Sequence, residues 1–215
     1  MKLYFISGLG ADERAFEKLL IPEGYEVKHI PWKPLSGNTS IEGYSRLLAE
    51  EIDASAPFIL AGLSFGGIIA TEISKYLKPE KLILFSTVKH RKELPFYYRI
   101  AGRLKLYKLI PPGIFRSTLW FLFWFFGPLN PTGRVLISSF IKQADPLFLK
   151  WALGQISMWT NKEILPGTIH IHGKKDRAFP VAFCEPDYIV NGGHLCVFTH
   201  AREVNEILKR ELKRN

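Results

Sequence analysis

A serine placed between glycines is the feature of this sequence that most directly suggests chemistry. Gly62, Ser64 and Gly66 fit the pattern G-x-S-x-G, which falls between an apolar run and a stretch with helical spacing. Small residues two positions before and after a serine allow a sharp turn from strand to helix. Such a turn exposes the hydroxyl and directs the first N–H groups of the helix at developing negative charge. A tight turn without chemical function is the alternative interpretation of Ser64.

A serine nucleophile needs a base, and the base needs an acid that orients it. Asp176 directly follows the fifth apolar run of the chain, and His194 follows the sixth run and a pair of glycines. Both therefore fall where the carboxyl ends of parallel strands meet. Asp187 is a rival acid, but it precedes the last run and would lie at the opposite edge of the sheet. A capping or surface role for Asp176 and a structural turn role for His194 are the alternatives.

The remaining histidines and the two cysteines suggest less. His170 and His172 lie on one face of a predicted strand, which could indicate a metal, but no further ligand cluster accompanies them. Cys184 and Cys196 are too few for a disulfide framework and lack the C-x-x-C spacing of a metal or redox site. We therefore expect two buried thiols, and neither a metal nor a cofactor.

Short apolar runs alternate with amphipathic stretches along much of the chain. Helical spacing of apolar residues follows a predicted capping box from Thr39 to Glu42, and recurs after Ser64 and over 201–212. This alternation predicts an α/β fold with about six mostly parallel strands and helices on both faces. The predicted strands have β-branched or aromatic residues and turn residues after them: 2–6, 25–30, 57–62, 81–86, 168–173 and 187–192.

Residues 89–160 interrupt this alternation. They are rich in aromatic and basic residues, are punctuated by proline and glycine, and predict several helices rather than strands. We expect residues 1–88 and 161–215 to form the core and residues 89–160 to form an inserted helical lid. The segment holds four of the five tryptophans, which are predicted to line an apolar pocket, with core packing as the alternative: Trp120, Trp124, Trp151 and Trp159.

The positive charge of the chain is concentrated in the same segment. Among 215 residues, 29 Lys and Arg stand against 20 Asp and Glu, and 11 of the basic residues but only two acids fall within 89–150. A basic rim near the lid suits an anionic amphiphile or an anionic membrane surface, and a solvated basic face is the alternative. Nucleic acid is not an expected partner, because the aromatic residues form an apolar block without interleaved basic residues. The basic residues of this rim are Arg91, Lys92, Arg99, Arg103, Lys105, Lys108 and Arg116.

Neither the N-terminus nor any internal run has the features of an export signal or a membrane span. The stretch MKLYFISGLGADER has a short apolar run that stops at a glycine. The longest apolar run, Leu119–Leu129, is shorter than the roughly 20 residues that a membrane-spanning helix needs. A hydrophobic content of 47% and a charged content of 23% are ordinary for a globular chain. The sequence predicts a cytoplasmic location.

The order Ser64, Asp176, His194, with a predicted strand before each, resembles the α/β-hydrolases. Within them it is similar to the small, lidded serine hydrolases of esterase, lipase and thioesterase type, and the resemblance covers nearly the whole chain. It implies that Ser64 is the nucleophile, that His194 acts as general base and then acid, and that Asp176 orients His194. It further implies an oxyanion hole formed by the backbone N–H groups of Leu9 and Phe65.

Two features depart from the family pattern. The family usually carries His-Gly before the first oxyanion donor, whereas Ser7 stands before Gly8 and Leu9 here. Since the donor is a backbone group, Leu9 can still serve, but different hydrogen bonds must hold the loop. The first predicted strand corresponds to the third strand of the family, so the two leading antiparallel strands are expected to be missing.

The resemblance implies hydrolysis of a small-molecule carboxylic ester or thioester through an acyl-enzyme, with an apolar acyl group. A serine nucleophile argues against haloalkane dehalogenases and epoxide hydrolases, which need a carboxylate at this position. Carbon–carbon bond hydrolases, perhydrolases and acyltransferases share the triad and stay open as alternatives. A ligand-binding protein of the same fold without turnover is an alternative of another class.

Overall fold

Parallel strands form the centre of the computed structural model, which describes residues 1–37, 39–111 and 113–213 apart from the side chains of 115 and 116. Within these residues six strands make one sheet of order β2-β1-β3-β4-β5-β6, and every neighbouring pair is parallel. The predicted α/β fold with about six mostly parallel strands is thereby confirmed. The strands are β1 Lys2–Ile6, β2 Glu26–Ile30, β3 Phe58–Leu63, β4 Lys81–Phe85, β5 Thr168–Gly173 and β6 Tyr188–Val190.

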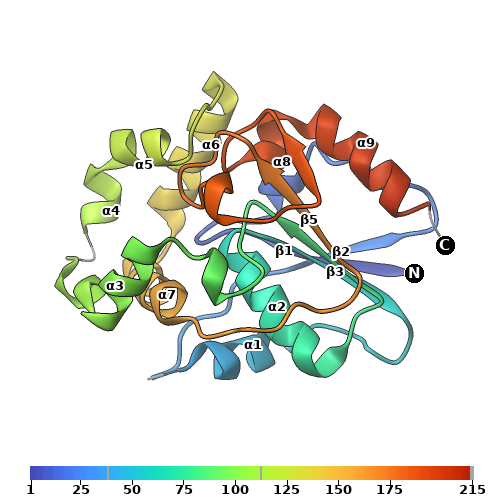
Figure 1. The fold of residues 1–215 in the computed structure, drawn as a ribbon, viewed down its shortest axis with the longest axis horizontal. Helices are drawn as coiled ribbons and strands as arrows, with labels where there is room; N and C mark the ends of the chain where they lie inside the picture. The colour runs from blue at the N-terminus through green and yellow to red at the C-terminus, as the bar shows by residue number, and fades with distance from the viewer. Residues whose placement is uncertain (38, 112, 214–215) are drawn as a thin grey trace.

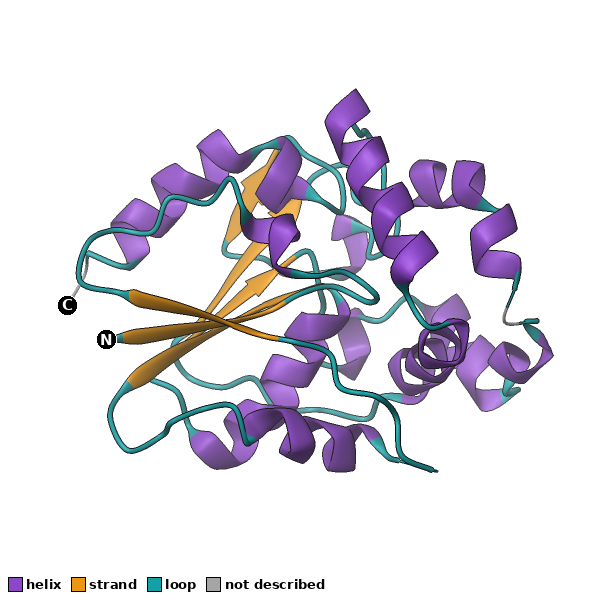
Figure 2. Ribbon diagram, turned by 180° about the vertical axis from the view of Figure 1, so that it is seen from behind, coloured by secondary structure: helices purple, strands orange, loops and turns teal. Residues whose placement is uncertain are grey.

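Helices cover both faces of the sheet (Figures 1 and 2). In β1, Leu3 and Phe5 belong to the core on the side of α8 and α9, whereas Tyr4 and Ile6 belong to the core on the side of α1 and α2. Successive side chains of a strand point to opposite faces, so a strand buried on both faces is apolar throughout. These helices are α1 Ile41–Ala49, α2 Phe65–Leu77, α8 Cys196–Thr199 and α9 Ala201–Glu211, with a short helix η1 at Glu13–Phe16.

The described residues between β4 and β5 contain helices and loops but no strand, and this segment both packs on the core and covers one end of the sheet (Figure 1). Phe140 of α6 is buried in one core and Phe148 of α7 in the other, so these two helices extend both layers. Helices α3, α4 and α5 follow one another along the outer edge of the molecule. The elements are η2 Arg91–Glu93, α3 Phe96–Arg103, η3 Leu106–Leu109, α4 Ile114–Ser117, α5 Leu119–Phe125, α6 Pro131–Gln143 and α7 Pro146–Met158, and the short η4 Val181–Phe183 lies between β5 and β6.

The capping box predicted from Thr39 to Glu42 is wrong by one residue. Ser40 is the N-cap of α1, and its side chain accepts a hydrogen bond from the backbone N–H of Gly43. Thr39 instead donates its hydroxyl to the carbonyl of Ser36. Because two hydroxyl residues stand side by side, the spacing to Glu42 alone could not identify the cap.

Among the described residues, no helix is both long enough and apolar enough to cross a membrane.

Candidate active site

Ser64 lies in the sharp turn between β3 and α2, and its backbone is strained. Its φ of 53° and ψ of −121° place a residue with a Cβ in a region that costs about 1–3 kcal/mol and that is typical of functional sites. The neighbouring glycines are required by close packing. A Cβ on Gly62 would lie 2.4 Å from the carbonyl oxygen of Gly66, and a Cβ on Gly66 would lie 2.2 Å from that of Ser7. The turn can form only with glycine at both positions.

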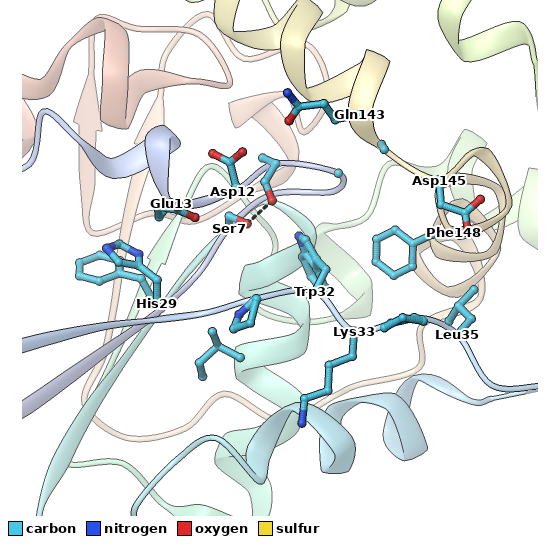
Figure 3. Close-up of a pocket in the computed structure, with 17 residues that line it drawn as sticks. Ser7, Asp12, Glu13, His29, Trp32, Lys33, Leu35, Gln143, Asp145 and Phe148 are labelled. Carbon is cyan, nitrogen blue, oxygen red and sulfur yellow. Dashed lines mark hydrogen bonds between the residues drawn. The ribbon is translucent and has the colours of Figure 1, made fainter.

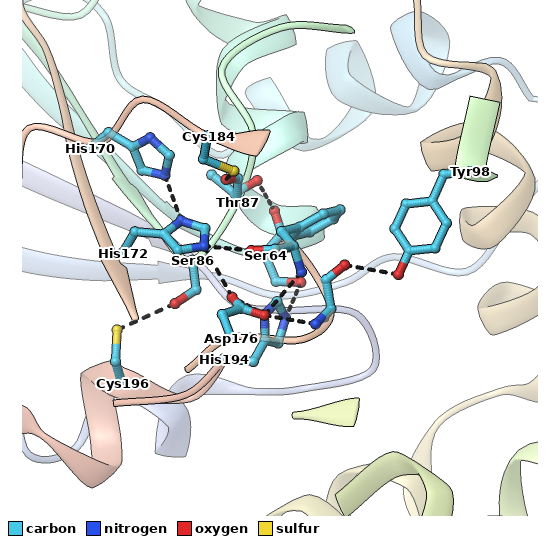
Figure 4. Close-up of polar contacts among 12 residues, drawn as sticks. Ser64, Ser86, Thr87, Tyr98, His170, His172, Asp176, Cys184, His194 and Cys196 are labelled. Atoms are coloured by element: carbon cyan, nitrogen blue, oxygen red, sulfur yellow. Dashed lines mark hydrogen bonds and ion pairs between the residues drawn. The ribbon is translucent and has the colours of Figure 1, made fainter. Parts of the chain in front are cut away.

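The structure brings the three predicted catalytic side chains together (Figure 4). His194 Nε2 lies 2.8 Å from Ser64 Oγ, and His194 Nδ1 lies 2.8 Å from Asp176 Oδ2. All three residues are buried or nearly so. A carboxylate can only accept, so Nδ1 of His194 carries the proton and Nε2 is free to accept the proton of Ser64.

The loop after β5 fixes the orientation of Asp176. Its Oδ1 accepts the backbone N–H groups of Ala178 and Phe179 at 2.8 and 2.9 Å, which leaves Oδ2 directed at His194. The rival acid Asp187 stands just before β6 and accepts the backbone N–H of a β5 residue at 2.7 Å. It therefore lies at the opposite edge of the sheet from His194, as predicted.

His170 and His172 form a buried chain of hydrogen bonds behind the acid (Figure 4). His172 Nε2 lies 2.7 Å from the carbonyl of Phe179, which can only accept, so Nε2 carries a proton. His172 Nδ1 then accepts from His170 Nε2 at 3.0 Å. Burial lowers the pKa of both imidazoles, that of His170 to about 2, so both rings are neutral. Three of the four ring nitrogens are thus occupied without a metal, and His172 Nε2 also lies 3.4 Å from Asp176 Oδ2.

The buried histidine pair makes the free energy of unfolding sensitive to acid. The folded-state pKa of His170 lies below its ordinary value of 6.5, so the unfolded chain binds a proton first and stability is lost as the pH falls below 6.5. The variant His170→Gln keeps an N–H donor for His172 but does not titrate. Between about pH 7 and about pH 5, the free energy of unfolding of the wild type should fall by up to about 2 kcal/mol more than that of the variant. Urea unfolding at both pH values measures this, and equal losses would contradict it.

Two backbone amides are placed to serve as the predicted oxyanion hole. Phe65 begins α2 directly after Ser64, where the first N–H groups of a helix have no partner within it. Leu9 lies in the loop after β1, and a Cβ on Gly8 would be 3.6 Å from the Cβ of Ser64. In the described part of the chain, neither N–H donates to another group. Both are therefore free to donate to an oxygen at the reacting carbon.

The loop that carries Leu9 is held by its own hydrogen bonds, in the absence of the family histidine. Ser7 donates its hydroxyl to the carbonyl of Ala11 at 2.6 Å, which closes the loop on itself. Trp32 donates its ring N–H to the carbonyl of Gly8 at 3.0 Å. As expected from the missing family histidine, different hydrogen bonds hold this loop, and Ser7 makes one of them.

An apolar cavity of about 190 Å³ opens beside Ser64 and His194. A smaller cavity of about 50 Å³ also reaches these two side chains, bounded by Phe140 of α6 and Leu195. Apart from the triad, the larger cavity offers polar atoms only from Tyr98, Ser157 and the backbone. Its apolar walls come mainly from α5 with the residue after it and from α7: Leu122, Phe125, Phe126, Leu149, Leu153 and Ile156.

The four tryptophans of residues 89–160 do not line this cavity, so that prediction is wrong. Trp120 and Trp124 are 72% and 55% exposed on the outer side of α5. Trp159 is buried and donates its ring N–H to Glu72 at 2.7 Å, and Trp151 packs on the core beside α1 and α2. Trp151 donates its ring N–H to the carbonyl of Thr39 at 2.8 Å, so the indole N–H groups of both Trp151 and Trp159 have polar partners that do not line the cavity.

The loop after α5 supports the site and was missed from the sequence. The carbonyl of Phe126 accepts the backbone N–H of His194 at 2.7 Å, and the two rings lie edge to face at 4.9 Å. Gly127 has a φ of +81°, and a Cβ there would lie 2.3 Å from the carbonyl oxygen of Lys175. The Gly-Pro pair at this point indicates a turn, but no local pattern shows that the turn contacts the loops of the acid and the base.

A separate groove of about 740 Å³ lies beside the ends of β1 and β2 (Figure 3). Its lining includes Ser7, His29, Trp32 and Gln143. The hydroxyl of Ser7 is donated to a backbone carbonyl, so no base activates it. The groove is larger than the cavity at Ser64, but it lacks an activated nucleophile, and the hydrogen-bonded triad locates the candidate site instead.

A parallel sheet with a strained serine turn after β3, an acid after β5 and a histidine after β6 is an α/β-hydrolase fold. No family model and no curated protein matches the sequence. Solved structures match at low identity, which shows the fold. They include a thermophilic esterase from Thermogutta terrifontis (TM-score 0.74, 16% identity, 100% of this chain and 90% of that chain). An enol-lactonase from Burkholderia xenovorans matches with a TM-score of 0.77 and 13% identity over 99% of this chain and 91% of that chain. MenH from S. aureus matches with a TM-score of 0.74 and 20% identity over 99% of this chain and 93% of that chain.

Proposed function

We propose that this chain is a serine hydrolase that cleaves a carboxylic ester or thioester through an acyl-enzyme. The observation that carries the proposal is the unbroken hydrogen-bond chain from Asp176 through His194 to Ser64, which ends at the edge of an apolar cavity. Two of the solved structures with this fold are described as an esterase and an enol-lactonase, which fits ester chemistry. The cytoplasmic location stays a prediction.

In the proposed reaction, Ser64 Oγ attacks the carbonyl carbon while His194 Nε2 takes its proton. The negative charge that develops on the carbonyl oxygen is stabilised by the N–H groups of Leu9 and Phe65, and Asp176 stabilises the imidazolium. The tetrahedral intermediate collapses as His194 returns the proton to the departing alcohol or thiol. Water, deprotonated by His194, then attacks the acyl-enzyme, and the acid is released with Ser64 restored. These steps use only groups of the chain and water.

The cavity walls favour an apolar substituent on the substrate. A site of about 190 Å³ with apolar walls binds an alkyl or aryl group by removing it from water. We assign the acyl group to this cavity and a small group to the cavity of about 50 Å³. The anionic amphiphile predicted from the basic charge of the insertion is one form of such a substrate.

A series of p-nitrophenyl esters from acetate to palmitate tests the proposal. We expect kcat/KM to rise to an intermediate acyl length, such as hexanoate, and to fall once the chain exceeds the cavity. Leu153→Trp places a larger side chain in the cavity wall and should lower kcat/KM for hexanoate by about tenfold or more while sparing acetate. Leu147→Trp is the matched control, because Leu147 is exposed on the same helix.

Labelling separates the proposal from its alternatives. A fluorophosphonate should modify the wild type at Ser64, as read from the mass of the peptide that contains it. Binding of esters without labelling or turnover would support the non-catalytic alternative. Labelling without ester turnover would favour carbon–carbon bond hydrolysis, perhydrolysis or acyl transfer on the same triad.

A further inference from the structure

We propose that the outer surface of the insertion is a docking surface for a bilayer that contains anionic lipids. We call this surface the cap face and define it as the exposed large apolar side chains between residues 96 and 124. Among the described residues of the whole chain, ten of the eighteen exposed large hydrophobic side chains fall within this stretch. Exposed apolar side chains concentrated in one segment are typical of an interaction site.

The phase of α3 shows that its exposed apolar residues form a stripe. Phe96, Ile100 and Leu104 are four residues apart, so they lie on one side of the helix, and all three are exposed. The opposite side packs inward, where a Cβ on Gly102 would meet the carbonyl of Ser157 in α7 at 2.4 Å. The outward stripe therefore takes no part in the core, although it is apolar.

Helix α5 is apolar on both sides. Leu122 and Phe125 line the cavity beside Ser64, whereas Trp120 and Trp124 point outward and are exposed. Figure 1 shows α3, α4 and α5 following one another along the same edge of the molecule, and Figure 2 shows the same arrangement from behind. The helices that bear the exposed apolar residues therefore lie along one edge of the molecule.

The segment that carries the cap face has charges of one sign only. The sequence contains no Asp or Glu between residues 94 and 144. Arg103, Lys105 and Lys108 are exposed among the apolar residues of α3 and η3, and Arg177 lies over the ring of Trp124 at 4.8 Å. Arg116 of the predicted rim has its side chain outside the described part. Basic residues next to exposed aromatic and aliphatic ones are typical of segments that lie in the interface of an anionic bilayer.

The same features argue against the other occupants of such a surface. A second copy bound through the same face would bring like charges together, because a two-fold interface pairs each patch with itself. A single nucleic acid strand would need rings whose faces are open for stacking, whereas the ring of Phe121 stacks on those of Trp124 and Phe125, and Arg177 lies over the ring of Trp124. An anionic bilayer satisfies both the charge and the apolar area.

Sedimentation with lipid vesicles tests the proposal on the full chain. We expect binding to vesicles of phosphatidylcholine mixed with phosphatidylglycerol, weaker binding to phosphatidylcholine alone, and a loss of binding at high salt. The combined variant Leu104→Ser, Leu109→Ser, Trp120→Ser removes three of the most exposed side chains of the cap face. It should bind anionic vesicles about tenfold or more weakly than the wild type.

The matched control replaces three equally exposed apolar residues elsewhere: Leu20→Ser, Val135→Ser and Leu147→Ser. This control should bind vesicles like the wild type. Equal binding by the cap-face variant, or an equal loss in the control, would overturn the proposal. A dimer in analytical ultracentrifugation that only the cap-face variant abolishes would assign the face to a second copy instead. Because vesicle binding needs no turnover, its outcome is independent of the proposed hydrolase activity.

Discussion

Replacing Ser64 with alanine is expected to lower kcat/KM for an activated ester by about 10⁴-fold or more. The hydroxyl is the atom that would form the acyl-enzyme, and it is the partner of His194 Nε2 at 2.8 Å. The remaining groups could still bind the ester and polarise its carbonyl, so a small residual rate is expected. Initial rates with p-nitrophenyl hexanoate measure the effect, and fluorophosphonate labelling should be lost in parallel.

Ser86 offers a matched control for this substitution. It follows β4 as Ser64 follows β3, and its φ of 43° is also positive, but its hydroxyl contacts Cys196 Sγ at 3.3 Å and neither His194 nor Asp176. Ser86→Ala should therefore retain activity close to that of the wild type. Activity in Ser64→Ala at the level of Ser86→Ala would exclude Ser64 as the nucleophile.

Gly66→Ala is expected to destabilise the fold by about 3 kcal/mol or more. The added Cβ would lie 2.2 Å from the carbonyl oxygen of Ser7 and 2.4 Å from that of Ile6, and both are backbone atoms of the central strand region. Neither can move without displacing β1 or the loop that carries Leu9. Chemical unfolding monitored by tryptophan fluorescence gives the change in the free energy of unfolding.

Gly43→Ala is the corresponding control within a helix. Gly43 is exposed in α1, and a Cβ there would meet its nearest atoms at the ordinary distances of 3.5 and 3.6 Å. Alanine should stabilise this helix by about 0.5–1 kcal/mol, because glycine is disfavoured in helices. If both variants changed the stability equally, close packing would not explain the glycine at position 66.

The sheet and the meeting of Ser64, Asp176 and His194 could be predicted because they follow from topology. In a parallel sheet, every loop after a strand emerges at the same edge, so residues far apart in the chain converge there. The apolar runs indicate which loops these are, and Gly62, Gly173 and Gly192 end the predicted strands that precede Ser64, Asp176 and His194. To predict that the three residues meet, it was enough to know which strand each one follows, and the periodicity of apolar residues indicates the strands.

The walls of the cavity could not be predicted in the same way. Periodicity assigns a buried side to a helix only when the other side is polar, and α5 is apolar all round. The sequence therefore predicts that Trp120 and Trp124 line the pocket, whereas in the structure Leu122 and Phe125 line it and both tryptophans are exposed. The hydrogen bonds of Phe126 and His172 depend on which loops meet in space, and no local pattern contains that information.

At Ser64, the stability of the fold and the proposed catalytic activity favour different residues. At a φ of 53°, glycine would relieve the unfavourable conformation but would remove the hydroxyl that His194 contacts. The surrounding framework must hold this conformation, since Ser64 itself disfavours it. Selection for stability alone would therefore favour glycine at position 64, whereas selection for activity would favour serine.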